Sequence, residues 1–216
     1  MTHLIISGEN LTSLEGIDLT NVTYLDCINN SLTSLPALPQ CLLQLRCGAN
    51  RLTSLPTLPI GLKWLECEYN LLTSLPLLPE GLETLGCEFN RLTSLPLLPE
   101  ALRELNCEYN LLTSLPLLPE GLEELICVCN KLVSLPILPL SLSKLRCAGN
   151  YVLFKTNIDD IKLDEYNQMR KDMGWKTVSS IRKNELKEMR EKWKIWQYRL
   201  DGAKYNQAEK EMNKLN

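Results

Sequence analysis

Residues 81–100, GLETLGCEFNRLTSLPLLPE, carry the pattern that decides the fold, because variants of this 20-residue unit fill most of the first 150 residues. Seven asparagines recur at intervals of 20 residues, and each follows a cysteine by three positions. The asparagines are Asn30, Asn50, Asn70, Asn90, Asn110, Asn130 and Asn150, and the cysteines are Cys27, Cys47, Cys67, Cys87, Cys107, Cys127 and Cys147. Self-similarity at a fixed period of this length is the signature of a solenoid of stacked repeats.

Each unit is expected to contain a short strand and a proline-rich return segment. Leu85 and Cys87 alternate with outward residues, which is typical of a half-buried strand. Stacking makes successive strands parallel, and each asparagine follows its strand, where its amide can bond to the backbone of the bend and of a neighbouring repeat. In the return segment, proline excludes helix and favours polyproline II, so Leu95 and Leu98 both face inward. The pattern predicts a parallel strand face, a polyproline II outer wall and modest curvature.

The first copy of the unit is atypical. Leu4, Ile6, Leu11 and Leu14 keep the spacing, but Glu9 takes the asparagine position and the proline-rich return is replaced. An altered end repeat is expected where a solenoid needs a cap. The sequence therefore predicts about eight repeats over residues 1–150, of which the first is the cap.

Residues 151–216 differ from the repeats in composition and form a second predicted unit. All 12 prolines and all nine cysteines precede them, whereas they hold 15 basic and 11 acidic side chains. Apolar residues at helical spacing predict a helical C-terminal cap or tail, with a stripe of Leu186, Met189, Trp193, Trp196 and Leu200. The stripe packs on the solenoid in one interpretation and binds a partner or a second copy in the other.

The composition excludes several function classes. The chain has one histidine, His3, and no catalytic triad, phosphate loop or metal cluster, so we expect no enzyme activity, cofactor or small-molecule substrate. No run of 18 apolar residues occurs, and the first residues lack the features of a signal peptide. These observations favour an intracellular protein.

The nine cysteines are interpreted as core residues of a protein in a reducing compartment. Seven of them occupy one inward column, and Cys41 takes a position that holds small residues in other repeats. The single Cys-x-Cys pair, Cys127 and Cys129, is not expected to form a metal site. Cys129 lies in a partly exposed column, so it is predicted to be the most reactive thiol.

The outward positions place acidic and aromatic residues together on the concave strand face. The candidate partner-binding residues are Trp64, Glu66, Glu68, Tyr69, Glu88, Phe89, Glu104, Glu108, Tyr109 and Glu124. Three interpretations remain open for this face: a solvated surface kept for solubility, a docking surface for a basic protein, and a cation site. Nucleic acid is disfavoured there, since phosphates are bound by Lys and Arg.

A second surface is predicted on the opposite wall. Its residues occupy the middle of Leu-Pro-x-Leu-Pro, where the flanking leucines already take the inward places; they are Leu77, Leu97, Leu117 and Ile137. An apolar ladder of this kind usually marks an interface, so this outer ladder and the tail stripe are the two candidate homodimer surfaces.

The unit Leu-Pro-x-Leu-Pro-x-Gly-Leu-x-x-Leu-x-Cys-x-x-Asn-x-Leu-Thr-Ser-Leu-Pro resembles the 20-residue leucine-rich repeats of bacterial effectors of the YopM and IpaH type. Variants with cysteine before the asparagine are also similar to repeat proteins of large DNA viruses. The resemblance covers roughly residues 4–150 and implies an α/β leucine-rich repeat solenoid that acts in the host cytoplasm. The 66-residue tail has no cysteine, so the ubiquitin-ligase activity of the IpaH type is not expected.

Three functions follow as hypotheses. The first is a non-catalytic protein-interaction scaffold that binds a basic partner on the acidic, aromatic strand face. The second is an adaptor that acts through the basic tail by dimerisation or by contact with nucleic acid or an anionic membrane. Interspersed glutamates weaken that contact. The third is a truncated relative of the effector ubiquitin ligases without their catalytic domain.

Overall fold

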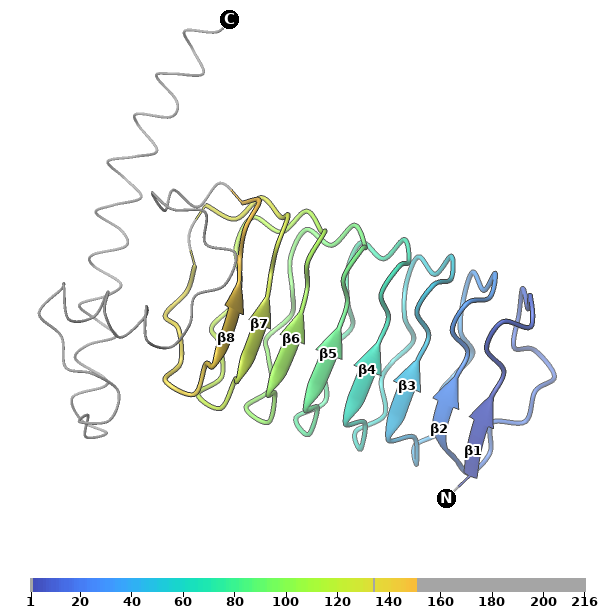
Figure 1. The fold of residues 1–216 in the computed structure, drawn as a ribbon. Helices are drawn as coiled ribbons and strands as arrows, with labels where there is room; N and C mark the ends of the chain where they lie inside the picture. Colours follow the sequence, from blue (N-terminus) through green and yellow to red (C-terminus); the bar gives the residue numbers. More distant parts are fainter. Residues whose placement is uncertain (1, 134, 151–216) are drawn as a thin grey trace, which may run out of the picture.

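The computed structural model describes residues 2–133 and 135–150, which form a parallel β-solenoid (Figure 1). One eight-stranded sheet runs through it in the order β1 to β8, with every neighbouring pair parallel. The strands are β1 Thr2–Ile5, β2 Val22–Asp26, β3 Gln44–Arg46, β4 Trp64–Glu66, β5 Thr84–Gly86, β6 Glu104–Asn106, β7 Glu124–Ile126 and β8 Lys144–Arg146. The predicted strand face is confirmed.

The predicted tail of residues 151–216 lies outside the described residues. This applies to its helices and to its stripe of Leu186, Met189, Trp193, Trp196 and Leu200. The division at residue 150 therefore stays a prediction.

The register of the sheet follows the repeat period. From β2 to β8 the paired residues of neighbouring strands lie 20 positions apart, as Leu65 and Leu85 do. Between β1 and β2 the offset is one residue larger, since Leu4 pairs with Leu25, and the register shifts between Thr2 and His3. The first repeat is thus atypical, as its sequence predicts.

The leucine columns form one continuous hydrophobic core along the solenoid. Within one repeat Leu82, Leu85, Cys87 and Leu92 are completely buried. Leu95 and Leu98 of the same return segment pack against this core while partly exposed. The described return segments contain neither helix nor strand, in agreement with the exclusion of helix by proline. Each three-residue strand from β3 to β8 is therefore anchored by its central buried leucine and by the buried cysteine directly after the strand.

An asparagine ladder joins successive repeats at the turn that follows each strand from β2 to β8. It consists of Asn30, Asn50, Asn70, Asn90, Asn110, Asn130 and Asn150. Asn90 shows the arrangement: its Nδ2 donates to the carbonyl oxygens of Cys67 at 3.0 Å, Cys87 at 3.2 Å and Glu88 at 3.1 Å. Its Oδ1 accepts from the backbone N–H of Leu72 at 3.0 Å. The backbone groups of the bend and of the preceding repeat are thereby satisfied, which confirms the role predicted for these asparagines.

The residue before each ladder asparagine adopts a left-handed backbone conformation. In three consecutive repeats that residue is aromatic: Tyr69 and Phe89 have a φ of 50° and Tyr109 has a φ of 49°. This region disfavours bulky L-residues. This conformation accompanies stacking of the three rings. The ring centroids are 4.3 Å apart in the Tyr69–Phe89 and Phe89–Tyr109 pairs, with interplanar angles of 8° and 11°. The sequence predicts a partly exposed aromatic column here but not its strained backbone.

The cysteine column is buried, as predicted for core residues, and all nine cysteines are free thiols. Desolvation raises the pKa of the Cys27 thiol to about 12 and that of the fully buried Cys67 thiol well above its ordinary value. The prediction for Cys129 is wrong in one respect. Cys129 is half-buried, whereas Cys41 is exposed, with its Sγ donating to the carbonyl oxygen of Val22 at 3.4 Å.

We expect native alkylation with iodoacetamide to label Cys41 first, Cys129 next and the seven buried cysteines last, since burial and raised pKa values both suppress thiolate reactivity. Denaturing alkylation without reductant should label all nine. Peptide mapping by mass spectrometry gives the order. Equal native labelling of Cys41 and Cys67 would contradict the buried column.

Candidate functional site

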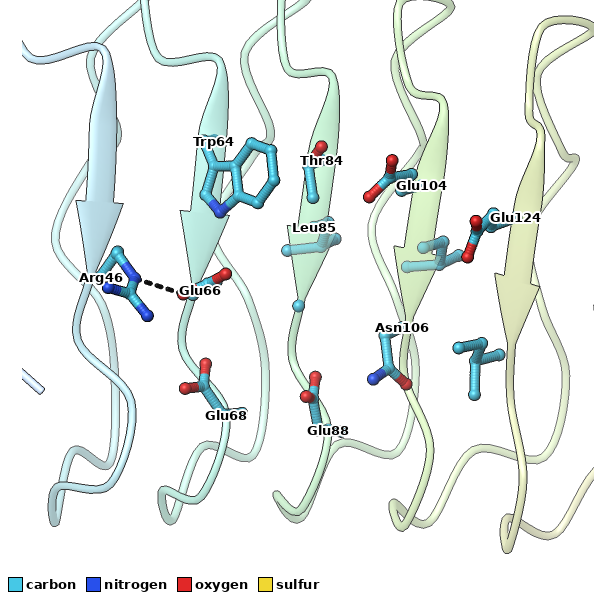
Figure 2. A pocket seen from close by; sticks show the side chains of 13 residues that line it. Arg46, Trp64, Glu66, Glu68, Thr84, Leu85, Glu88, Glu104, Asn106 and Glu124 are labelled. Atoms are coloured by element: carbon cyan, nitrogen blue, oxygen red, sulfur yellow. Dashed lines mark hydrogen bonds and ion pairs between the residues drawn. The ribbon is translucent and has the colours of Figure 1, made fainter. Parts of the chain in front are cut away.

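A hollow of about 380 Å³ lies on the strand face across β3 to β7 (Figure 2). Carboxylates dominate its lining, which contains five glutamates and a single arginine. The lining residues are Arg46, Trp64, Glu66, Glu68, Thr84, Leu85, Gly86, Glu88, Glu104, Leu105, Asn106, Glu124 and Ile126.

Gly86 opens the floor of the hollow. In the last position of successive strands the outward residues are Arg46, Glu66, Gly86, Asn106 and Ile126, so the one residue without a side chain lies in the middle. A Cβ on Gly86 would lie 3.3 Å from Glu88 Oε2 and 3.6 Å from Glu66 Cγ. The space above Gly86 is therefore bounded by these two glutamates.

The upper rim is formed by the first residue of successive strands. Trp64, Thr84, Glu104 and Glu124 follow one another there, and Figure 2 shows the indole of Trp64 beside Thr84. Glu124 accepts a hydrogen bond from Lys144 Nζ at 2.9 Å. The rim thus offers an aromatic surface on one side of the hollow and carboxylates on the other.

Arg46 closes one end of the hollow by bridging three repeats. Its Nε donates to Glu66 Oε2 at 2.6 Å and its Nη1 donates to Asp26 Oδ2 at 2.9 Å. Hydrogen bonds to Glu66 and to the Tyr24 hydroxyl raise the pKa of the guanidinium, which stays charged. The only arginine of the lining is therefore already paired within the protein.

Glu68 and Glu88 are half-buried, which their outward sequence positions do not reveal. The Oε2 atom of each is shielded from solvent and has no hydrogen-bond partner. Desolvation is the main cause that raises the pKa of Glu88 to about 7 and that of Glu68 above its ordinary range. Glu68 reaches this position because it lies across Gly48, where a Cβ would collide with its carboxylate. The interpretation of a freely solvated acidic column is wrong for these two residues.

The structure brings together six of the candidate residues predicted from the sequence: Trp64, Glu66, Glu68, Glu88, Glu104 and Glu124 line the hollow. Tyr69, Phe89 and Tyr109 form the separate aromatic stack at the turn, and Glu108 does not line the hollow. Sequence reasoning missed Arg46, Gly86, Asn106 and Ile126 as site residues. The interruption of a charged column by Gly86 is the signal that could have found them.

We expect the stability of the protein to fall as the pH rises through the pKa of Glu88. Its folded-state pKa of about 7 exceeds the ordinary 4.5, so the folded protein binds the proton more tightly than the unfolded chain does. The stabilisation is complete below about pH 4.5 and is lost as the pH passes 7. Glu88→Gln should therefore unfold at higher urea concentration than the wild type at pH 8 and flatten the profile from pH 5 to 8.

The matched control for this measurement is Glu80→Gln, at an exposed turn position. It should leave the pH dependence of the urea midpoint unchanged. Parallel wild-type and Glu88→Gln profiles would show that Glu88 titrates as a solvated carboxyl.

Residues 2–133 and 135–150 contain no group of three or more His, Cys, Asp or Glu side chains placed to hold a metal ion. Over the same ranges no helix is long and apolar enough to cross a membrane.

Stacked 20-residue units with one short parallel strand each, buried leucine columns and an asparagine ladder define a leucine-rich repeat solenoid. The structure is similar to a Shigella effector LRR domain, at 34% identity over 69% of this chain and 69% of that one, with a TM-score of 0.61. The chain belongs to the leucine-rich repeat family that includes this effector domain.

Two structures of YopM are also similar. YopM from Yersinia enterocolitica WA-314 is 40% identical over 60% of this chain, with a TM-score of 0.59. YopM from Yersinia pestis, a leucine-rich effector protein, is 34% identical over 68% of this chain, with a TM-score of 0.66. The matches cover 29% and 43% of those two chains. No protein-family model matches the chain, and no curated protein sequence does.

Proposed function

We propose that this solenoid is a non-catalytic interaction platform that binds a basic protein partner on its strand face. The observation that carries the proposal is the hollow itself, in which five glutamates and Trp64 surround a floor opened by Gly86, while the single arginine is already paired. Interaction surfaces of repeat solenoids are built in this way, from outward residues of successive repeats.

The two kinds of side chain in the hollow have complementary effects on binding. Carboxylates attract a basic partner over several ångströms and raise the association rate, and salt screens this attraction over about 8 Å at physiological ionic strength. Trp64 offers apolar area that is removed from water in the complex, which lowers the dissociation rate. A partner with basic side chains around a small apolar contact fits this surface.

The free thiols support a reducing, intracellular site of action for this platform. All nine cysteines are unpaired, and seven of them are buried in a column where a disulfide would disturb packing. The outer ladder supports an additional contact, since Leu77, Leu97 and Leu117 are 85%, 82% and 73% exposed, whereas Ile137 is half-buried. The adaptor hypothesis and the homodimer through the tail stripe involve residues outside the described ranges and stay predictions, and so does a homodimer through the outer ladder.

We expect Glu88→Lys with Glu104→Lys to reduce partner binding about tenfold or more at low salt, because two attractive charges of the hollow become repulsive. The matched control is Glu80→Lys with Glu100→Lys, which changes net charge equally at exposed turn positions. Both variants and the wild type serve as baits for cell extracts at two salt concentrations, and captured proteins are quantified by mass spectrometry.

The proposal requires a set of proteins that the wild type and the control retain and that the hollow variant loses. Their retention by the wild type should fall as salt increases. Equal retention by all three baits would move the site away from the strand face, to the outer ladder of Leu77, Leu97 and Leu117 or to the tail.

A further inference from the structure

Arg46 shows how the strand face binds a guanidinium group of the protein itself. Arg46 occupies the last position of β3, between Asp26 of β2 and Glu66 of β4. Its guanidinium donates to both carboxylates, one repeat to either side, at 2.9 Å and 2.6 Å. A planar group with several donors can bridge two acids at this spacing, which a single ammonium group does less well.

Gly86 occupies the same position two repeats further on, without a side chain. Glu66 precedes it in the column and Asn106 follows it. The carboxylate of Glu88 leans over Gly86, because Glu88 Oε2 lies 3.3 Å from the place where a Cβ would be. That oxygen is shielded from solvent and has no hydrogen-bond partner. The surroundings of Gly86 therefore resemble those of Arg46 in part: Glu66 flanks both positions, whereas Asn106 takes the place of the second flanking acid and Glu88 supplies the other carboxylate from the turn after β5.

We propose that the hollow above Gly86 is a socket for the guanidinium group of an arginine side chain on the partner. The inference rests on the proposed function and names the group that the strand face recognises. A guanidinium entering above Gly86 meets Glu66 on one side and Glu88 over the floor, as Arg46 meets Asp26 and Glu66. Trp64 on the rim offers an aromatic face to the same cation.

The volume and chemistry of the hollow agree with this occupant. About 380 Å³ accommodates one long side chain with its neighbouring backbone but not a folded domain. The unpartnered Glu88 Oε2 would gain a charge-assisted hydrogen bond, and such a bond stabilises a desolvated carboxylate more than a neutral donor does. Asn106 supplies an amide next to Gly86 for backbone contacts of the incoming peptide.

The first test uses n-butylguanidinium as the probe, with the isosteric but neutral N-butylurea as its control, on the full chain at pH 8. Amide resonances of Gly86 and the indole N–H of Trp64 are followed by NMR during titration. We expect saturable shifts with a dissociation constant on the order of millimolar for butylguanidinium and none for butylurea. Glu88→Gln should weaken the binding at least tenfold.

Equal binding of n-butylammonium and n-butylguanidinium would overturn the socket, because it would show general attraction of cations. Shifts that are absent, or that centre on residues far from Gly86 and Trp64, would overturn it as well. Neither result depends on a variant that must fold.

The second test supplies the guanidinium from the chain itself. Gly86 has no left-handed φ, the one tight contact of an added Cβ is with the flexible end of Glu88 at 3.3 Å, and the Glu66 atoms lie at ordinary contact distances of 3.6 and 3.9 Å, so a side chain can be introduced there. Gly86→Arg should melt several degrees above Gly86→Met at pH 8, because only the former pairs with Glu66 and Glu88. A melting temperature of Gly86→Arg equal to or below that of Gly86→Met would contradict the socket.

The experiments distinguish failure of the guanidinium socket from failure of partner binding on the strand face. If the probe does not bind while Glu88→Lys with Glu104→Lys still loses its captured proteins, the strand face binds a partner without an arginine socket. If the probe binds at Gly86 while both baits capture the same proteins, the socket stands and the partner surface lies elsewhere.

Discussion

Replacement of Asn90 by leucine is expected to lower the free energy of unfolding by roughly 3–5 kcal/mol, since each buried polar group left unsatisfied costs about 1–3 kcal/mol. The Asn90 amide makes four hydrogen bonds to the backbone, three as donor and one as acceptor. Leucine has a similar volume and makes none of them. The buried N–H of Leu72 would then lose its acceptor, and the carbonyl oxygens of Cys67 and Cys87 would each lose one of two asparagine donors, keeping those from Asn70 and Asn110.

The matched control is Asn106→Leu, in the neighbouring repeat. Asn106 Oδ1 accepts a single bond from the N–H of Glu108, at 3.3 Å, and the residue lies on the half-buried strand face. Its replacement should change the free energy of unfolding by less than about 1 kcal/mol. Urea denaturation followed by circular dichroism measures both variants. Similar losses for the two would show that the ladder is not the main link between repeats.

Leu85→Ala is expected to lower the free energy of unfolding by about 2–5 kcal/mol, the range for a leucine removed from a packed core. Leu85 is 0% exposed, between Leu65 and Leu105 of the adjacent strands. Leu97→Ala in the same repeat should change it by less than about 0.5 kcal/mol, because Leu97 is 82% exposed. The same urea titration gives both values.

A large loss of unfolding free energy for Leu97→Ala would have a separate structural explanation. It would show that the outer ladder is covered in solution, by residues 151–216 or by a second copy of the chain. Sedimentation velocity of the wild type and of Leu97→Ala then separates these two occupants, since only the second changes the mass of the particle.

The repeat architecture could be predicted from the sequence because each of its determinants recurs. A leucine at every twentieth position fixes which face of the strand is buried, and the asparagine after it fixes where the chain bends. The irregular first repeat could also be predicted, since Glu9 replaces the asparagine and the proline-rich return is absent from this copy. The structure adds that the register of β1 is shifted by one residue. A single three-residue strand would leave its buried face ambiguous in the sequence, but the same pattern in seven repeats resolves it.

The site could be predicted only in part, because it depends on residues that do not repeat. Periodicity places Glu68 and Glu88 outward. It does not show that the missing side chains of Gly48 and Gly86 leave room for the carboxylates of Glu68 and Glu88, respectively, to pack close to the backbone. The left-handed conformation of Phe89 was likewise hidden, since that residue type seldom adopts it and the stack with Tyr69 and Tyr109 offsets the strain. Such effects follow from neighbours in the adjacent repeat.

The constant register from β2 to β8 affects how genes for such chains diverge. Positions 20 residues apart are equivalent, so unequal exchange between two repeats of the gene rejoins equivalent positions wherever the breakpoints fall. Loss of residues 81–100 would set Glu66 directly beside Asn106 and remove Gly86, while leucine columns and asparagine ladder continue unbroken. One recombination event thus changes the side chains that line the hollow of the strand face and leaves the leucine core and the asparagine ladder intact, so the altered chain can still fold.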